Sequence, residues 1–113
     1  MKHEIIIKRD PFKAEEYQKK GDNLGNVWII GPGGVRIKNP DYRIEIFLSK
    51  NGLIGLGTEL IRLAYSFKEG KHSHIYPISK DEVCQAMGIF LTPDSNELII
   101  CCDNLGTLDD YVK

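Results

Sequence analysis

A run of regularly spaced apolar residues in the middle of this 113-residue chain constrains its fold most. The residues of the run are Leu53, Leu56, Leu60, Leu63, Ala64 and Phe67. Steps of three and four residues place them on one face of an α-helix, so the spacing predicts an amphipathic helix. We expect Asn51 to cap the start of this helix and Gly70 to end it.

Four β-strands and a short helix are expected ahead of the main helix. The elements are a strand over residues 4–8, a short helix from Asp10-Pro11 to Gly21, strands over residues 26–30 and 35–38, and a strand over residues 42–48. Gly31-Pro32-Gly33-Gly34 has the composition of a hairpin loop between two of them. In the last strand Tyr42, Ile44, Ile46 and Leu48 would share one face.

Further strands and one short helix are expected after the main helix. The elements are a strand over residues 73–76, a short helix over residues 79–86, and two strands over residues 88–91 and 97–102. Ser79 and Glu82 have the spacing of a capping box, which favours the short helix. Residues 92–96 have the composition of a type I turn, so we expect the last two strands to pair with each other.

This order of elements predicts an α+β fold in one domain that spans residues 1–113. A single antiparallel-rich sheet would carry the main helix on one face, together with one or two short helices. A doubly wound α/β fold requires a more regular alternation of strands and helices. The length and the ordinary apolar content, 42%, suit one compact core.

A glycine-rich stretch lies where a phosphate-binding loop would lie. Gly52, Gly55 and Gly57 have the spacing G-x-x-G-x-G, which differs from the dinucleotide-binding fingerprint. Their positions fall inside the helical pattern, so close packing of the helix on the sheet is the better explanation. No cofactor is expected.

Two histidines form the most suggestive polar pair. His72 and His74 would lie on the same face of a strand, where both imidazoles could reach one metal ion. Cys84 or Asp81 could supply a third ligand, although the spacing matches no known zinc pattern. A metal-binding module or metal-dependent enzyme that uses His72 and His74 is therefore one alternative function. A hydrogen-bonded surface histidine is the plainer interpretation.

The cysteines and the N-terminus indicate the compartment in which the protein works. Three cysteines, Cys84, Cys101 and Cys102, make a poor disulfide framework and favour a reducing compartment. Cys84 is expected to be buried, and at least one of the adjacent pair should point inward. The N-terminus lacks the pattern of a signal peptide, so we expect a cytoplasmic protein without a membrane span.

Acidic residues are concentrated in the last third of the chain. Residues 1–78 carry thirteen Lys and Arg against nine Asp and Glu, whereas residues 79–113 carry two against seven. The formal net charge of −1 argues against nucleic-acid binding. The acidic third could face a partner, although a solvated surface is the commoner reason for such a run. A homodimeric regulatory domain formed through an exposed strand edge is a further alternative.

The stretch 44–103 resembles the type 32 group of small bacterial immunity proteins, which are associated with polymorphic toxin systems. The resembling segments are Phe47 to Leu53, Leu60 to Ala64, His72 to Tyr76 and Glu97 to Ile100. The sequence departs from the family pattern at Tyr76, where the family's strand has a second histidine, so only His74 carries over.

The resemblance implies a non-catalytic protein that neutralises a cognate toxin by binding it. An acidic surface would suit a basic toxin, because complementary charge steers association. The residues expected on the partner-binding face are His74, Asp94, Glu97, Asp103, Asp109 and Asp110.

Overall fold

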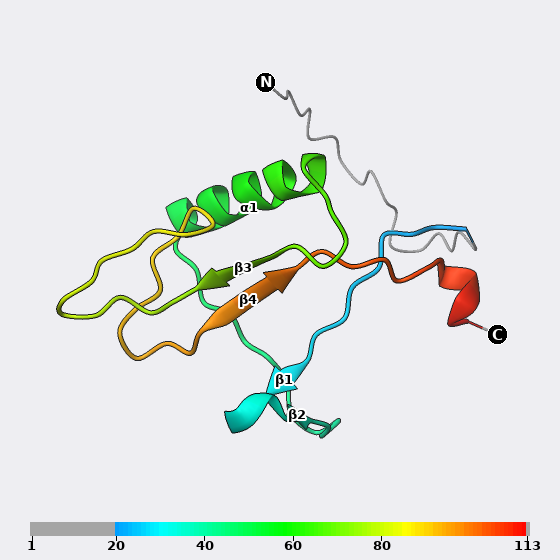
Figure 1. Cartoon of the computed structure of the whole chain (residues 1–113), viewed down its shortest axis with the longest axis horizontal. Helices are drawn as coiled ribbons and strands as arrows, with labels where there is room; N and C mark the ends of the chain where they lie inside the picture. The colour runs from blue at the N-terminus through cyan, green and yellow to red at the C-terminus, as the bar shows by residue number, and fades with distance from the viewer. Residues whose placement is uncertain (1–19, 113) are drawn as a thin grey trace. The chain divides into compact units, whose positions relative to one another are not determined.

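The computed structural model describes residues 20–112 of the chain (Figure 1). The elements in chain order are β1 (Ile29–Ile30), the 3-10 helix η1 (Pro32–Gly34), β2 (Arg36–Ile37), α1 (Lys50–Tyr65), β3 (His72–Ile75), β4 (Leu98–Cys101) and the 3-10 helix η2 (Leu108–Asp110). The α+β class is confirmed. The strand expected over residues 4–8 and most of the short helix expected after Asp10 lie outside the described residues.

The described chain forms two compact units. One unit is Trp28–Asn104, and the other includes residues 20–27 and 105–112. Within the second unit the Leu108 N–H donates to the Gly21 carbonyl at 2.8 Å. The first unit holds α1 and both sheets and therefore the expected site residues up to Asp103.

The main helix forms where the apolar spacing places it, but its caps differ from those expected. The Ser49 side chain accepts a hydrogen bond from the Gly52 N–H at 3.0 Å, so Ser49 is the N-cap and Asn51 lies inside the helix. At the other end the Ser66 N–H donates to the carbonyls of Arg62 and Leu63. α1 therefore ends at Tyr65, before Gly70, which takes a positive φ in the turn that leads to β3.

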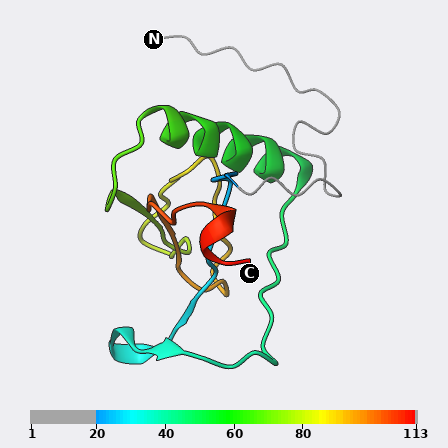
Figure 2. The same ribbon diagram turned by 90° about the vertical axis from the view of Figure 1, so that its right-hand side faces the viewer.

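The core of the larger unit is small and joins three segments. Leu56 of α1, Ile75 of β3 and Ile89 of the following loop are buried together, and Ile75 is only 1% exposed. The partly buried side chains packed against them are Leu48, Ala86, Met87, Leu91, Leu98 and Ile100. Figures 1 and 2 show α1 lying along one side of the β3–β4 pair. The buried face of α1 is narrower than the predicted stripe, because Leu53 and Leu60 remain exposed and Phe67, also exposed, lies beyond the end of the helix.

β3 and β4 pair antiparallel with a register that directs alternate side chains toward the helix. Ser73 lies opposite Ile100 and Ile75 lies opposite Leu98. The expectation that residues 97–102 pair with residues 88–91 is therefore wrong. Pairing with β3 places Leu98 and Ile100 against the cluster that contains the buried Ile75, and burial of apolar surface favours this arrangement.

Residues 88–91 belong instead to the loop that closes the core. Ile89 forms an isolated bridge with Ala86, and Leu91 forms one with Pro77. The expected turn after them is confirmed by the hydrogen bond from the Ser95 N–H to the Thr92 carbonyl at 2.9 Å.

The hairpin expected around Gly31–Gly34 is confirmed, although its strands are short. Ile29 lies opposite Ile37 and Ile30 opposite Arg36, and the glycine loop contains η1. β1 and β2 form a separate two-stranded sheet, so the described residues contain two small antiparallel sheets rather than a single one. The Arg36 guanidinium lies 4.0 Å from the centre of the Trp28 ring, a cation–π contact across this hairpin.

Two further expected elements are absent from the described structure. Residues 42–48 form no strand, and no other described strand pairs with them. Residues 79–86 form no helix: Ser79 and Glu82 close a single turn through the Glu82 N–H and the Ser79 hydroxyl at 3.1 Å. The Ser79 side chain thus stabilises a single turn, and no helix follows that turn.

Two glycines bring α1 against the loop that carries Ile89. A Cβ added to Gly55 would overlap the carbonyl oxygen of Gly88, and a Cβ on Gly88 would overlap the backbone of Gly55. Close packing thus explains Gly55, although the neighbour is a loop and not the sheet. A Cβ added to Gly57 would have no neighbouring atom within 4 Å, so packing does not explain that glycine.

These two glycines provide a matched test of that contact. We expect Gly55→Ala to lower the free energy of unfolding by about 1–3 kcal/mol, because the added methyl forces the helix and the loop apart. Gly57→Ala should instead raise the free energy of unfolding by about 0.5–1 kcal/mol, because alanine favours the helix. Urea unfolding followed by circular dichroism measures both. Equal effects of the two substitutions would contradict the close contact.

Candidate functional site

The outer face of the β3–β4 pair, which points away from the core, gathers most of the chemically distinctive side chains. His72 lies opposite Cys101, and His74 lies opposite Ile99. Tyr76 and Glu97 continue the same alternation beyond the last pair. We call these six residues the outer face: His72, His74, Tyr76, Glu97, Ile99 and Cys101.

Three rings follow one another along β3 and its extension. The His72 and His74 rings meet edge to face with their centres 5.0 Å apart. The His74 and Tyr76 rings stack with their centres 5.5 Å apart and an angle of 9° between their planes. Residues two apart on a strand point the same way, so regular β geometry produces this row. Each ring therefore restricts the rotation of its neighbour.

Hydrogen bonds fix the orientation of both imidazoles. The His74 Nδ1–H donates to the Glu97 carboxylate at 2.6 Å, and the His72 Nδ1–H donates to the Gly70 carbonyl at 3.2 Å. Because both acceptors lack a proton to donate, the Nδ1 atoms carry the hydrogens. In this tautomer each Nε2 atom is a hydrogen-bond acceptor.

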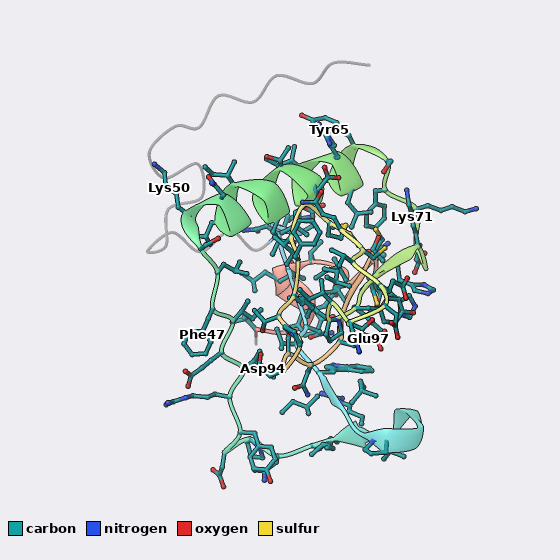
Figure 3. The ribbon with its side chains drawn as sticks, turned by 90° about the vertical axis from the view of Figure 1, so that its left-hand side faces the viewer. Phe47, Lys50, Tyr65, Lys71, Asp94 and Glu97 are labelled. Carbon is teal, nitrogen blue, oxygen red and sulfur yellow. The ribbon has the colours of Figure 1, made fainter. Side chains whose placement is uncertain are left out.

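Two of the expected partner-binding residues, His74 and Glu97, thus lie in direct contact. Asp94 lies in the turn before β4, three residues ahead of Glu97 in the chain; both are labelled in Figure 3. Asp103 follows β4 closely, and its carboxylate accepts a hydrogen bond from the Asn104 N–H at 2.9 Å. Three acidic side chains therefore mark the two ends of β4.

The other two expected residues belong to a different part of the chain. Asp109 and Asp110 lie in η2, in the smaller unit. The Asp110 carboxylate accepts a hydrogen bond from the Thr107 N–H at 2.9 Å, so it caps this short helix. The Asp110 carboxylate therefore stabilises η2, and Asp110 belongs to a different unit from His74 and Glu97.

The turn before β4 perturbs the ionisation of Asp94. The Thr92 hydroxyl donates to the Asp94 carboxylate at 2.7 Å and, together with the backbone N–H of Asp94, lowers the pKa of that carboxyl. Asp94 is fully exposed. The turn before β4 thus favours a negative charge on Asp94.

The residues that the structure describes do not provide the third ligand that a metal site on His72 and His74 would need. Both Nδ1 atoms are already hydrogen-bonded, and within residues 20–112 no three His, Cys, Asp or Glu side chains are grouped to hold a metal ion. Asp81 and Cys84 lie in the irregular loop after β3. Cys84 is exposed, so the expectation that it is buried is wrong, whereas Cys102 is buried next to the exposed Cys101 as expected.

Sequence reasoning missed the contribution of Ile99 and Cys101 to the outer face. Both residues alternate with more buried neighbours on β4, and this alternation is visible in the sequence. Their position beside the histidines depends on which strand pairs with β4, and that strand is distant in the chain, since His74 and Glu97 are 23 residues apart. Local patterns carry no information on such a pairing.

Comparison with known protein families identifies the chain. A family model described as Immunity protein 32 matches residues 43–103, which is more than half of the sequence. The chain belongs to the Immunity protein 32 family. No curated protein and no solved structure matched the chain.

The matched residues contain the elements that build the outer face. They include α1, β3 and β4 and both sides of the small core, and they end at Asp103. The family membership gives the protein a role in immunity. In the described part of the chain, no helix combines the length and apolarity that a bilayer crossing requires.

The Thr92–Asp94 hydrogen bond can be tested by titration. Thr92→Val should raise the pKa of Asp94 toward its ordinary value, because the hydroxyl that stabilises the carboxylate is removed. Since the folded-state pKa is the lower one, this interaction stabilises the native state above the unfolded-state pKa and is lost as the pH falls through the folded-state pKa. Carboxyl NMR shifts measure the change. Thr58→Val, whose hydroxyl bonds the Ile54 carbonyl, is the control and should leave Asp94 unchanged.

Proposed function

We propose that this protein neutralises a cognate bacterial toxin by binding it through the outer face, without catalysing a reaction. The observation that carries the proposal is the row of three rings on the outer surface of regular β-structure in a member of an immunity family. Aromatic side chains are enriched at the centres of protein interfaces and often dominate their energetics.

The geometry of the outer face supports tight binding because it is ordered before the partner arrives. The rings restrict one another, and Glu97 holds the His74 imidazole. Side chains that are already fixed lose less rotamer freedom on association. Tyr76 and Ile99 remain about half exposed and so offer apolar surface for a partner to cover.

The charges around this face favour a toxin with a basic surface. Asp94, Glu97 and Asp103 bracket β4 with negative charge. Such charge accelerates encounter with a positively charged partner at low ionic strength. Asp109 and Asp110 remain predicted partner contacts of the smaller unit, and binding through the outer face does not depend on them.

The proposed place of action is the cytoplasm of the bacterium that makes the toxin. Cys84 and Cys101 expose thiols, which remain reduced in that compartment. Binding there would block the toxin before it reaches its target in the producing cell. This mode of action requires a complementary surface and no reactive group.

Co-expression with the toxin encoded beside this protein tests the proposal. We expect the protein to restore growth and to purify with the toxin as a complex. Tyr76→Ala and Glu97→Ala should each weaken the affinity by about tenfold or more, because they remove an aromatic anchor and the acid that orients His74. Isothermal titration calorimetry measures the dissociation constants.

Two variants outside the outer face serve as matched controls. Phe67→Ala removes a ring that is as exposed as Tyr76, at 52% against 56%, and Arg62→Ala removes an exposed charge from α1. Both should leave the affinity within about twofold of the parent. Loss of affinity in the controls alone would assign binding to the helix, and failure to form any complex would refute the proposal.

A further inference from the structure

The segment between the first hairpin and α1 forms no strand and pairs with no other described residues. Tyr42 donates its N–H to the Asn39 carbonyl at 3.1 Å, where a turn ends. From residue 43 to residue 47 no backbone hydrogen bond joins the chain to any other described residue. Figure 3 shows this open stretch leading to α1, with Phe47 projecting from it. Among residues 20–112 these backbone groups therefore have no partner, and another chain could pair with them.

The side chains of this segment alternate as they do in a β-strand. Tyr42, Ile44 and Ile46 would share one face and are 59%, 48% and 56% exposed. Arg43 and Glu45 share the opposite face, where the Arg43 Nε–H donates to the Glu45 carboxylate at 2.7 Å. The segment thus has an apolar face that is about half exposed and an opposite face with one charge of each sign.

The order of these residues is self-complementary. When two copies of the segment run antiparallel with Ile44 opposite Ile44, each Arg43 lies opposite the Glu45 of the other copy. Tyr42 then lies opposite Ile46 on the apolar face. Opposite charges and aromatic–β-branched pairs directly across two strands are both stabilising.

The neighbouring registers are unfavourable. A shift that places Arg43 opposite Arg43, or Glu45 opposite Glu45, sets like charges against each other. A shift of one residue places charged side chains opposite apolar ones, because it exchanges the faces. The charge pattern therefore selects one register.

We infer that a second copy of this chain binds along residues 42–46, as an antiparallel strand pair centred on Ile44. The pairing supplies partners for the unpaired backbone groups, covers the apolar face and replaces the ion pair within each chain by two ion pairs between chains. A two-stranded ribbon of this length is marginally stable by itself, so the association is weak and concentration-dependent. This inference is independent of toxin binding, because it uses none of the residues of the outer face.

Charge reversal provides a direct experiment. Sedimentation equilibrium of the parent protein from about 10 µM to about 1 mM should show an apparent mass that rises from the monomer toward twice that value, as a weak interface predicts. Arg43→Glu and Glu45→Arg should each remain monomeric over the same range, because each opposes like charges across the pair. Both side chains are exposed, so neither substitution disturbs the core.

A mixture of the two variants distinguishes this pairing from other association. In a 1:1 mixture of Arg43→Glu and Glu45→Arg every opposed pair again has opposite charges, so the apparent mass should rise as it does for the parent. Each variant keeps like charges within its own chain, and the recovery can therefore come only from contacts between chains. Arg62→Glu and Glu69→Arg repeat the charge changes elsewhere on the surface and should behave like the parent.

Several results would overturn the inference. They are a parent protein that stays monomeric at about 1 mM, association that survives both single reversals, and a mixture that fails to recover. A monomeric parent whose toxin affinity falls with both reversals would assign the segment to the toxin instead. If only the Tyr76 and Glu97 variants lose toxin binding, the toxin binds the outer face and residues 42–46 remain the site for a second copy.

Discussion

The burial of Ile75 between α1 and the loop after β3 is the interaction on which the larger unit depends. Ile75 is the most deeply buried large side chain among the described residues, and it contacts a core supplied by Leu56 and Ile89. Full burial of such a side chain contributes about 1.5–3 kcal/mol. Because the core cluster has only three buried members among the described residues, Ile75 supplies much of the hydrophobic stabilisation of this core. The orientation of β3 follows from it.

Once Ile75 points inward, strand alternation determines the outer face. His74 and Tyr76 flank Ile75 and must point to the other side, and His72 follows in the same register. The close approach of Gly55 and Gly88 allows the loop to place Ile89 over the same core. The row of rings is therefore a consequence of the packing beneath it. The mutual order of the rings requires no bound partner.

Much of the local structure could be predicted from the sequence, whereas the pairing of distant strands could not. The apolar spacing located α1, and the Gly31–Gly34 loop located the first hairpin, because both signals lie within a few residues. The strand at residues 72–75 was predicted almost to its ends. The partner of β4 was predicted wrongly, because proximity favoured residues 88–91 while core burial selected β3.

The same distinction applies to the candidate site. His72 and His74 were expected on one face because residues two apart share a face, and the structure places their rings in contact. The contact between His74 and Glu97 depends on the β3–β4 register, which only the burial of both strands decides. The acidic residues were grouped by composition, and the structure separates them: Asp94 and Glu97 adjoin β4, while Asp110 caps η2.

The outer face and the segment 42–46 differ in whether their backbone groups are hydrogen-bonded, and this difference determines what each can bind. On the outer face the β3–β4 ladder satisfies the backbone, so a partner gains only from side chains, and specificity comes from the shape and charge that those side chains present. In residues 43–46 the backbone has no hydrogen-bond partner among the described residues, and any extended chain could supply one. A strand with such an edge needs a feature that restricts its partners. The alternating Arg43 and Glu45 provide that feature, because they penalise every register except the one that opposes opposite charges.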